Sequence, residues 1–350
     1  MRALSAADSV SLAIQRTRDF LFRPFSWGTY LKLGLVAIIT EGSSSNFRSS
    51  SGGGHPSRSA PVLDPSFAFP AYKIAVAVAA CLLVLFVAIW IFYLITRLRF
   101  AFFYCMTTNT REIRPGWHLY REPAARFFRL NLIVGLCFLL LAAVVSIPFV
   151  TGFWRLFHAI PPGGHVDVAT LLSLVLPLIP LVLLFVVAGI LLDVILRDWM
   201  LPHFAVDNAT AGEAWSAVWD TVTAEKKQFF VYALLRLVLP IVAMAVLFMV
   251  LLIPGLIVAG SIGALVYAIH SAFAGSTGGS AEAGLLVQIF FGSVGFLLML
   301  LALICLGGPI STGIREYALT FYGGRYQALG DLLYPPAAPP PPATRATASA

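Results

Sequence analysis

RDWMLPHFAVDNATAGEAWSAVWDTVTAEKKQFF, residues 197–230, is the stretch of sequence that decides the predicted fold. It starts where one long apolar run ends and stops where the next begins, and at least three weaker copies lie at similar junctions. A pattern that recurs at fixed spacing is typical of a repeated structural unit. The sequence therefore predicts a repeated membrane unit, in which two spanning segments are joined to an amphipathic strip.

The composition is that of an integral membrane protein. Hydrophobic residues make up 59% of the 350 residues and charged residues only 11%, with a mean hydropathy of +0.88. Soluble domains have roughly 25% charged residues. A net charge of +7 would suggest a nucleic-acid partner in a soluble chain, but here the basic residues must first be placed relative to the bilayer. We therefore expect membrane lipids, and no nucleic acid, as partners.

Five apolar runs have the length of about 20 residues that a spanning helix needs. A sixth run is shorter and contains Lys32, but in the register of the repeat it takes the place of the spans that start near Leu130 and Val231. The predicted spans are 27–40, 74–96, 130–150, 168–196, 231–253 and 285–306. We predict an all-α, polytopic transmembrane helix bundle over residues 1–334, with six spans in three two-span repeats. Whether 27–40 crosses fully is left open.

The repeat register rests on arginines that follow the spans. Arg97, Arg197 and Arg315 align, and an aromatic residue follows each of them seven positions later. On this register the strips between repeats are equivalent, and we expect them to be interfacial helices on one side of the membrane.

Two strips have clear helix signals. Thr210 and Glu213 form a capping-box pattern, followed by an apolar stripe at Trp215, Val218, Trp219 and Val222. Ser5 and Asp8 predict a similar start for a helix over 5–22, with a stripe at Val10, Ile14, Thr17 and Leu21. Such helices either lie in the plane of the interface or pack on the bundle, and the sequence does not decide between the two.

Basic residues gather in the strips, which places the strips and both termini in the cytoplasm by the positive-inside rule. The intervening loops, including a Ser/Gly-rich loop over 41–72, are then on the outer side. Residues 335–350 are rich in Pro and Ala and predict a disordered tail. We find no cleavable signal, and we expect a multi-pass protein of a bacterial inner membrane.

The strip also resembles a known motif. Pro202, then Glu213, Ala214 and Trp215, then Lys226, Lys227, Phe229 and Phe230 are similar to the motif of a broad group of bacterial six-span proteins, which includes the membrane domain of some glycerophosphodiester phosphodiesterases. The resemblance covers most of residues 1–334 and implies a polytopic inner-membrane bundle. No phosphodiesterase catalytic domain is present in the sequence, so the resemblance does not imply that activity.

Few residues are candidates for chemistry. Asp193 is the only acid inside a predicted span, and an ion pair with Arg197 at i, i+4 is the simpler interpretation than a proton relay. Arg236 is expected to reach the interface or to meet Asp193. The candidate contacts for lipid headgroups are Arg97, Arg111, Arg114, Arg121, Arg126, Lys226 and Lys227.

No other catalytic or metal site is predicted. The histidines of the outer loops lack helical metal-ligand spacing, the four cysteines form no C-x-x-C pair, and neither a nucleophile elbow nor a phosphate-binding glycine loop occurs. His203 is interpreted as an interfacial side chain. We expect no catalytic residue, no cofactor and no metal.

Two functions remain. The first is a non-catalytic membrane protein that assists envelope or lipid physiology, or anchors protein partners through its strips. The alternative is a secondary transporter or channel for a small solute or lipid, which the internal repeats, the proline-containing span 168–196 and an expected break at Pro254 and Gly255 favour. An enzyme is the least supported. Substrate, partners, oligomeric state and an enclosed cavity cannot be read from the sequence.

Overall fold

The computed structural model describes residues 4–46, 71–159, 168–273 and 279–335. Within these ranges the chain is α-helical and has no strand, which confirms the predicted fold class. The helices are α1 (Asp8–Phe22), α2 (Trp27–Asn46), α3 (Ala71–Thr107), α4 (Ile113–Leu119), α5 (Arg121–Ala159), α6 (Val168–Val194), the π-helix η1 (Ile195–Met200), α7 (Leu201–Val206), α8 (Ala211–Ala224), α9 (Lys226–Phe273), α10 (Gly279–Gly323) and α11 (Gln327–Leu333).

Five helices are long and apolar enough to cross a membrane. They lie within 75–107, 121–156, 171–206, 226–253 and 289–323. Each is longer than its predicted span, because the helix continues from the apolar run into the strip beside it. The expected break at Pro254 and Gly255 is wrong, since α9 remains helical through both residues. The prolines at 148, 177, 180 and 309 likewise lie inside helices.

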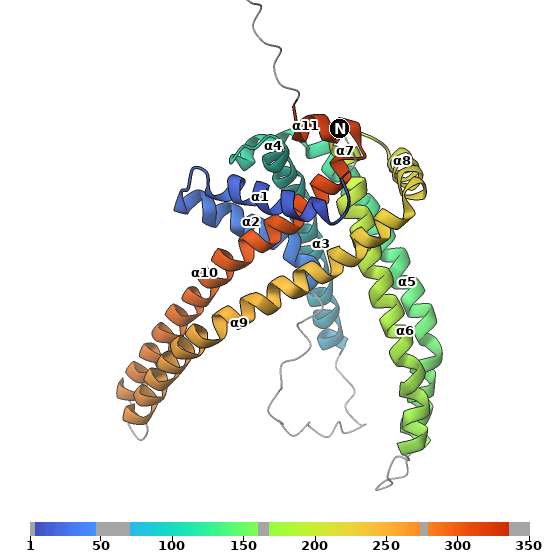
Figure 1. The fold of residues 1–350 in the computed structure, drawn as a ribbon. Coiled ribbons are helices and arrows are strands. Elements are labelled where there is room, and N and C mark those ends of the chain that lie inside the picture. Colours follow the sequence, from blue (N-terminus) through green and yellow to red (C-terminus); the bar gives the residue numbers. More distant parts are fainter. Residues whose placement is uncertain (1–3, 47–70, 160–167, 274–278, 336–350) are drawn as a thin grey trace, which may run out of the picture.

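The short helices gather at one end of the molecule, where the ends of the long helices meet them (Figure 1). We call this end the cap: α1, α2, α4, η1, α7, α8, α11 and the adjoining ends of α3, α5, α9 and α10. From it the long helices extend as three legs, namely α3, the α5–α6 pair and the α9–α10 pair (Figure 1). The buried core lies in the cap, with Phe100, Phe127 and Tyr322 among its fully buried side chains.

Helix α8 begins as predicted. The Thr210 N–H donates to the Glu213 carboxylate at 2.8 Å, and the Glu213 N–H donates to the Thr210 hydroxyl at 3.4 Å, which completes the capping box. The hydrogen bond from the Thr210 N–H lowers the pKa of the Glu213 carboxyl. Trp215 and Trp219 stack with ring centroids 6.2 Å apart and remain about half exposed, so the tryptophans do not face the core.

The predicted apolar stripe of α1 is divided between a buried and an exposed surface. Thr17 and Leu21 of the stripe are buried, together with Ser9, Ala13 and Phe20, whereas 64% of Ile14 is exposed. The cause is α10, where Gly313 has no side chain and Thr17 approaches it closely. Small residues pack at close helix crossings, whereas the apolar pattern alone would choose Ile14.

Helix α2 does not have the direction that the repeat predicts. The Tyr30 hydroxyl donates to the Cys305 carbonyl, Gly34 packs on Gly308, and Ile38 lies against Gly307. Residue numbers along α2 and α10 therefore rise in the same direction, toward the cap. Helix α9, which leads away from the cap, runs antiparallel to α10, as Tyr232 contacts Tyr317 and Ile262 contacts Gly295. Segment 27–40 is also absent from the five helices of spanning length, so the six-span prediction is not supported at this segment.

Candidate functional site: a buried ion-pair network

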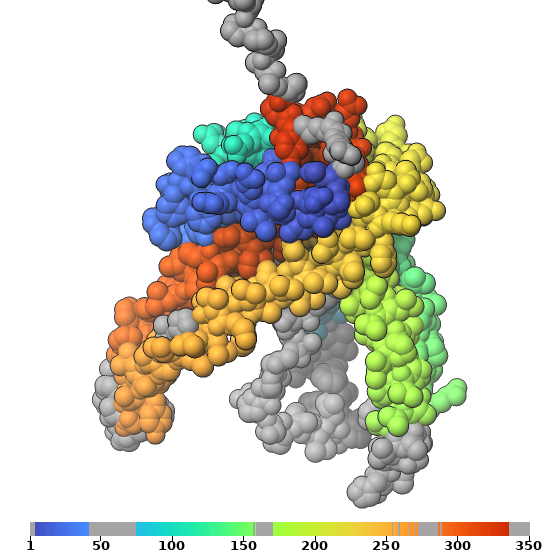
Figure 2. All heavy atoms as spheres, in the orientation of Figure 1, coloured from blue at the N-terminus to red at the C-terminus, as the bar shows by residue number. Residues whose placement is uncertain are grey.

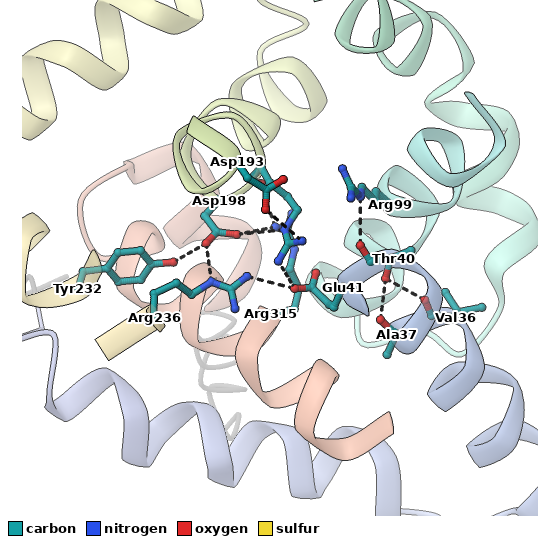
Figure 3. A network of polar contacts seen from close by, with 11 residues as sticks. Val36, Ala37, Thr40, Glu41, Arg99, Asp193, Asp198, Tyr232, Arg236 and Arg315 are labelled. Atoms are coloured by element: carbon teal, nitrogen blue, oxygen red, sulfur yellow. Dashed lines mark hydrogen bonds and ion pairs between the residues drawn. The ribbon is translucent and has the colours of Figure 1, made fainter. Parts of the chain in front are cut away.

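Charged side chains from four elements meet in the cap, where the legs converge (Figure 3). Glu41 comes from the last turns of α2, Asp198 and Arg197 from η1, Arg236 from α9 and Arg315 from α10. Arg236 lies ten positions into α9, about 15 Å along its axis from Lys226 at 1.5 Å per residue. The network therefore lies within the apolar helices and below the surface of the cap.

The π-helix explains why two neighbouring residues of α6's continuation point into the network. A π-turn changes the angular spacing of successive side chains and is frequent at functional sites. In η1 both Arg197 and Asp198 are buried, with 6% and 0% of their side chains exposed. Successive side chains are about 100° apart in an α-helix and somewhat closer in a π-helix, so the π-turn brings these two side chains nearer to a common side.

Asp198 is at the centre of the network. Its Oδ2 accepts hydrogen bonds from Arg236 Nε at 2.8 Å and from the Tyr232 hydroxyl at 2.9 Å. Its Oδ1 accepts from Arg315 Nη1 at 3.2 Å. A fully buried carboxylate is stable only when paired and hydrogen-bonded, and these three donors meet that requirement.

Glu41 is the second buried acid. Its Oε2 lies 2.5 Å from Arg197 Nη2 and 3.1 Å from Arg236 Nη2, and 6% of its side chain is exposed. One residue earlier, the Thr40 carbonyl accepts a hydrogen bond from Arg99 Nε at 3.1 Å. The C-terminal part of α2 is thus tied to α3, η1 and α9.

Only part of this site follows from the sequence. The predicted pair is confirmed, with Arg197 Nη1 3.6 Å from Asp193 Oδ2, although 38% of the Asp193 side chain is exposed. Arg236 forms its ion pairs with Asp198 and Glu41 and not with Asp193, and the alternative that it reaches the membrane interface stays a prediction. Sequence reasoning missed Asp198, although it adjoins Arg197, and it assigned Glu41 to the opposite, outer side of the membrane.

The repeat register is also inexact at the arginines. Arg197 and Arg315 lie in one network, in which both contact Asp198. Arg97 does not, because its guanidinium stacks on Trp117 at 4.2 Å and donates to the Trp117 carbonyl at 2.7 Å. Arg99, two residues on, is the α3 arginine that faces the network.

The candidate headgroup contacts divide into two groups. Arg97, Arg111 and Arg126 hydrogen-bond to protein: Arg111 to the carbonyls of Phe20 and Pro24, and Arg126 to Asn208. The remaining candidates are exposed and form no ion pair with another described residue. They are Arg114, Arg121, Lys226 and Lys227.

A smaller polar cluster holds α7 to α10 and α11. His203 is buried, not interfacial as predicted, and its Nε2 lies 2.7 Å from the Tyr322 hydroxyl. Its Nδ1 lies 3.4 Å from Asp207 Oδ2, which also accepts a hydrogen bond from the Tyr326 hydroxyl. Burial, with this hydrogen bond to Asp207, raises the pKa of Tyr326. The contacts join segments more than a hundred residues apart.

The chemistry available to the ion-pair network is limited by its arginines. Guanidinium groups stay protonated in proteins, so they fix charge and do not pass protons. Within the described residues, no group of three or more His, Cys, Asp or Glu is placed to hold a metal ion. Removing one member of a buried ion pair costs far more than an exposed pair is worth, which makes the network a junction that fixes four elements relative to one another.

Together, the long apolar helices and the internal charged junction define a multi-pass α-helical membrane protein. The chain belongs to a family of unknown function (DUF7544), whose model matches residues 4–332. No curated protein and no solved structure matches it significantly. The resemblance to phosphodiesterase membrane domains stays a prediction.

Proposed function

We propose that this protein is a non-catalytic, lipid-associated membrane protein of a bacterial inner membrane, with its cap and both termini on the cytoplasmic side. It would assist envelope or lipid physiology, or anchor partners at the cap. The observation that carries the proposal is the contrast between a buried cap and unburied legs. In the most apolar window of each spanning helix, no more than 6% of the residues are buried within the protein.

The exposed apolar surfaces of the legs support contact with lipid and do not support a transport pathway. A channel or transporter places its helices around a cavity and buries polar groups there. Here the apolar surfaces of the legs remain open, with Leu139, Phe248 and Met299 among many large side chains that are more than 60% exposed. In a bilayer such surfaces are covered by acyl chains or by other helices.

Exposed basic residues on the cap supply the charge for anionic headgroups. Arg114 lies in the first turn of α4, Arg121 begins α5, and Lys226 and Lys227 begin α9. Basic residues next to an anionic membrane surface contribute about 1 kcal/mol each to association. Exposed Trp215 and Trp219 on α8 are also typical of a helix at the interface.

Neutralising the four exposed basic residues should weaken the preference for anionic lipid. We expect the variant Arg114→Gln, Arg121→Gln, Lys226→Gln, Lys227→Gln to bind spin-labelled phosphatidylglycerol at least about fivefold more weakly, since the loss of even one charge near the surface costs about 1 kcal/mol. The measurement is the motionally restricted lipid fraction by electron paramagnetic resonance in mixed nanodiscs, at low and high salt.

The matched control neutralises four exposed acids of the cap: Glu112→Gln, Glu122→Gln, Asp220→Asn and Asp331→Asn. This variant should keep or strengthen the preference for phosphatidylglycerol. If the variant without the four basic residues preferred phosphatidylglycerol as strongly as the wild type, the role of those basic residues in lipid association would be refuted.

One observation favours the second candidate, a transporter: charged residues lie inside the spanning helices. Asp193, which pairs with Arg197 of the buried ion-pair network, is partly exposed. If it relayed protons or ions, Asp193→Asn would abolish solute-coupled flux in proteoliposomes. We expect no such loss, because the arginines around it cannot carry a proton; a specific flux lost in this variant and kept in Asp220→Asn would favour the transporter.

A further inference from the structure

An apolar groove runs along the lower side of α1, between it and the α9–α10 pair. Its volume is about 430 Å³, within the range of about 300–1,000 Å³ of small-molecule pockets. Figure 2 shows the side of the molecule on which α1 (blue) lies above α9 and α10 (yellow to red-orange). The groove therefore lies where the cap meets a lipid-exposed leg.

The side chains along the groove are almost all apolar. Ile14 and Phe22 line it from α1, Val242 and Ala243 from α9, and Ile310 from α10. Ile14, Phe22 and Val242 are 64%, 43% and 53% exposed. Large apolar side chains exposed along one continuous groove mark a binding surface.

The two hydroxyl groups of the groove differ in whether they have a hydrogen-bond partner. The Thr17 hydroxyl donates to the Ala13 carbonyl at 2.7 Å, so it needs no ligand. Tyr317 lines the groove as well, and its buried hydroxyl has no hydrogen-bond partner among the described residues. The groove thus combines apolar walls with one unpartnered hydroxyl group.

Arg18 is the charged residue that lines the groove. Its neighbours in sequence are paired, since Arg16 lies 3.3 Å from Glu316 and Arg23 lies 3.4 Å from Asp19. Arg18 is exposed and forms no ion pair in the parts of the chain that the structure describes. A cation next to an apolar groove is complementary to an amphiphile with an anionic head.

We propose that this groove binds one acyl chain of an anionic phospholipid, with the lipid phosphate at Arg18. Binding of the acyl chain alone would be only weakly favourable, because the surrounding lipid tails are as apolar as the groove. A phosphate matched to a guanidinium is a strong, charge-assisted contact and supplies the selectivity. The proposal rests on the lipid association proposed above and assigns it one site, on α1.

The site predicts a lipid that survives purification. In native mass spectrometry of detergent-solubilised protein, incubated with equal amounts of phosphatidylglycerol and phosphatidylcholine, we expect the wild type to retain one phosphatidylglycerol. Ala243→Trp fills the groove and should lower this retention about tenfold. Arg18→Gln should bind both lipids equally, because the phosphate contact is lost and the apolar groove remains.

Two matched variants control for general effects. Ala143→Trp makes the same change at an exposed position of α5, and Arg23→Gln removes an exposed arginine just beyond α1; neither residue lines the groove. Both should retain lipid as the wild type does. Equal retention in Ala243→Trp and Ala143→Trp would overturn the proposal, and so would a wild-type dimer that Ala243→Trp dissociates, since the occupant would then be a second copy of the chain.

This test is independent of the headgroup test on the cap surface. Arg18 is not among the four basic residues substituted there, and that measurement reports the whole lipid shell around the protein. Loss of shell selectivity without loss of the retained lipid, or the reverse, shows which of the two proposals has failed.

Discussion

Asp198→Asn is expected to open the cap. The substitution removes the carboxylate that Arg236, Arg315 and Tyr232 share, and leaves buried arginines facing one another with too little negative charge. Removing one partner of a buried ion pair costs about 3–5 kcal/mol, because the remaining charge stays buried without compensation. We expect the free energy of opening of the cap to fall by this amount.

Cys105 provides the measurement. It is fully buried in the cap, so a variant in which Cys81, Cys137 and Cys305 are replaced by Ala reports cap opening through the rate at which Cys105 reacts with a maleimide. Asp198→Asn should raise this rate at least about a hundredfold. An unchanged rate would show that Asp198 does not hold the cap together.

Two further variants separate burial from charge. Asp220→Asn makes the same change on the exposed face of α8 and should leave the rate unchanged. Asp193→Asn should have a small effect, since a partly exposed pair contributes about 0–1 kcal/mol. Adding Arg236→Gln to Asp198→Asn should recover part of the loss, because it removes one of the uncompensated charges.

Gly308→Val is expected to separate α2 from α10. A Cβ atom at residue 308 would lie 2.7 Å from the Cα atom of Gly34, which is backbone and cannot rotate away. Overpacking at such a contact costs typically about 1–3 kcal/mol, and more where the neighbour cannot move. Separation would also draw Glu41 away from Arg197 and Arg236, so both interactions should weaken together.

Hydrogen exchange of the α2 amides measures this effect. A loss of about 3 kcal/mol corresponds to roughly a hundredfold faster exchange. Gly292→Val is the matched control, because the same helix has open space around that glycine. If α2 exchanged alike in the two variants, the close contact between α2 and α10 would not determine where α2 lies.

Predictions that depend on residues close together in the sequence agree with the structure, whereas features that depend on distant residues were not predicted. The capping box at Thr210 and Glu213 and the pair of Asp193 with Arg197 involve residues three or four positions apart, and both were predicted and are present. Which part of the α1 stripe is buried was left open, because it depends on contacts such as that of Thr17 with Gly313, about three hundred residues away. Periodicity contains no information about such a partner.

Only part of the buried network could be predicted from the sequence, for the same reason. Arg197 and Arg236 stood out as charges near apolar runs, whereas Glu41 lies 156 residues from Arg197 and was assigned to an outer loop. Its assignment depended on the direction of α2, which the repeat gave as outward. The π-helix that turns Asp198 inward also has no local sequence signal that we recognised.

The sequence by itself determined that this chain is all-α and membrane-embedded, with charged strips between its long apolar runs. Those properties depend on the free energy of placing apolar and charged groups relative to a bilayer, which each segment has on its own. The tertiary structure decided that the strips form one buried cap, that α2 lies along α10 near Gly34 and Gly308, and that Glu41 and Asp198 meet the arginines. These features depend on contacts between distant segments, whose energies arise only when the helices pack together.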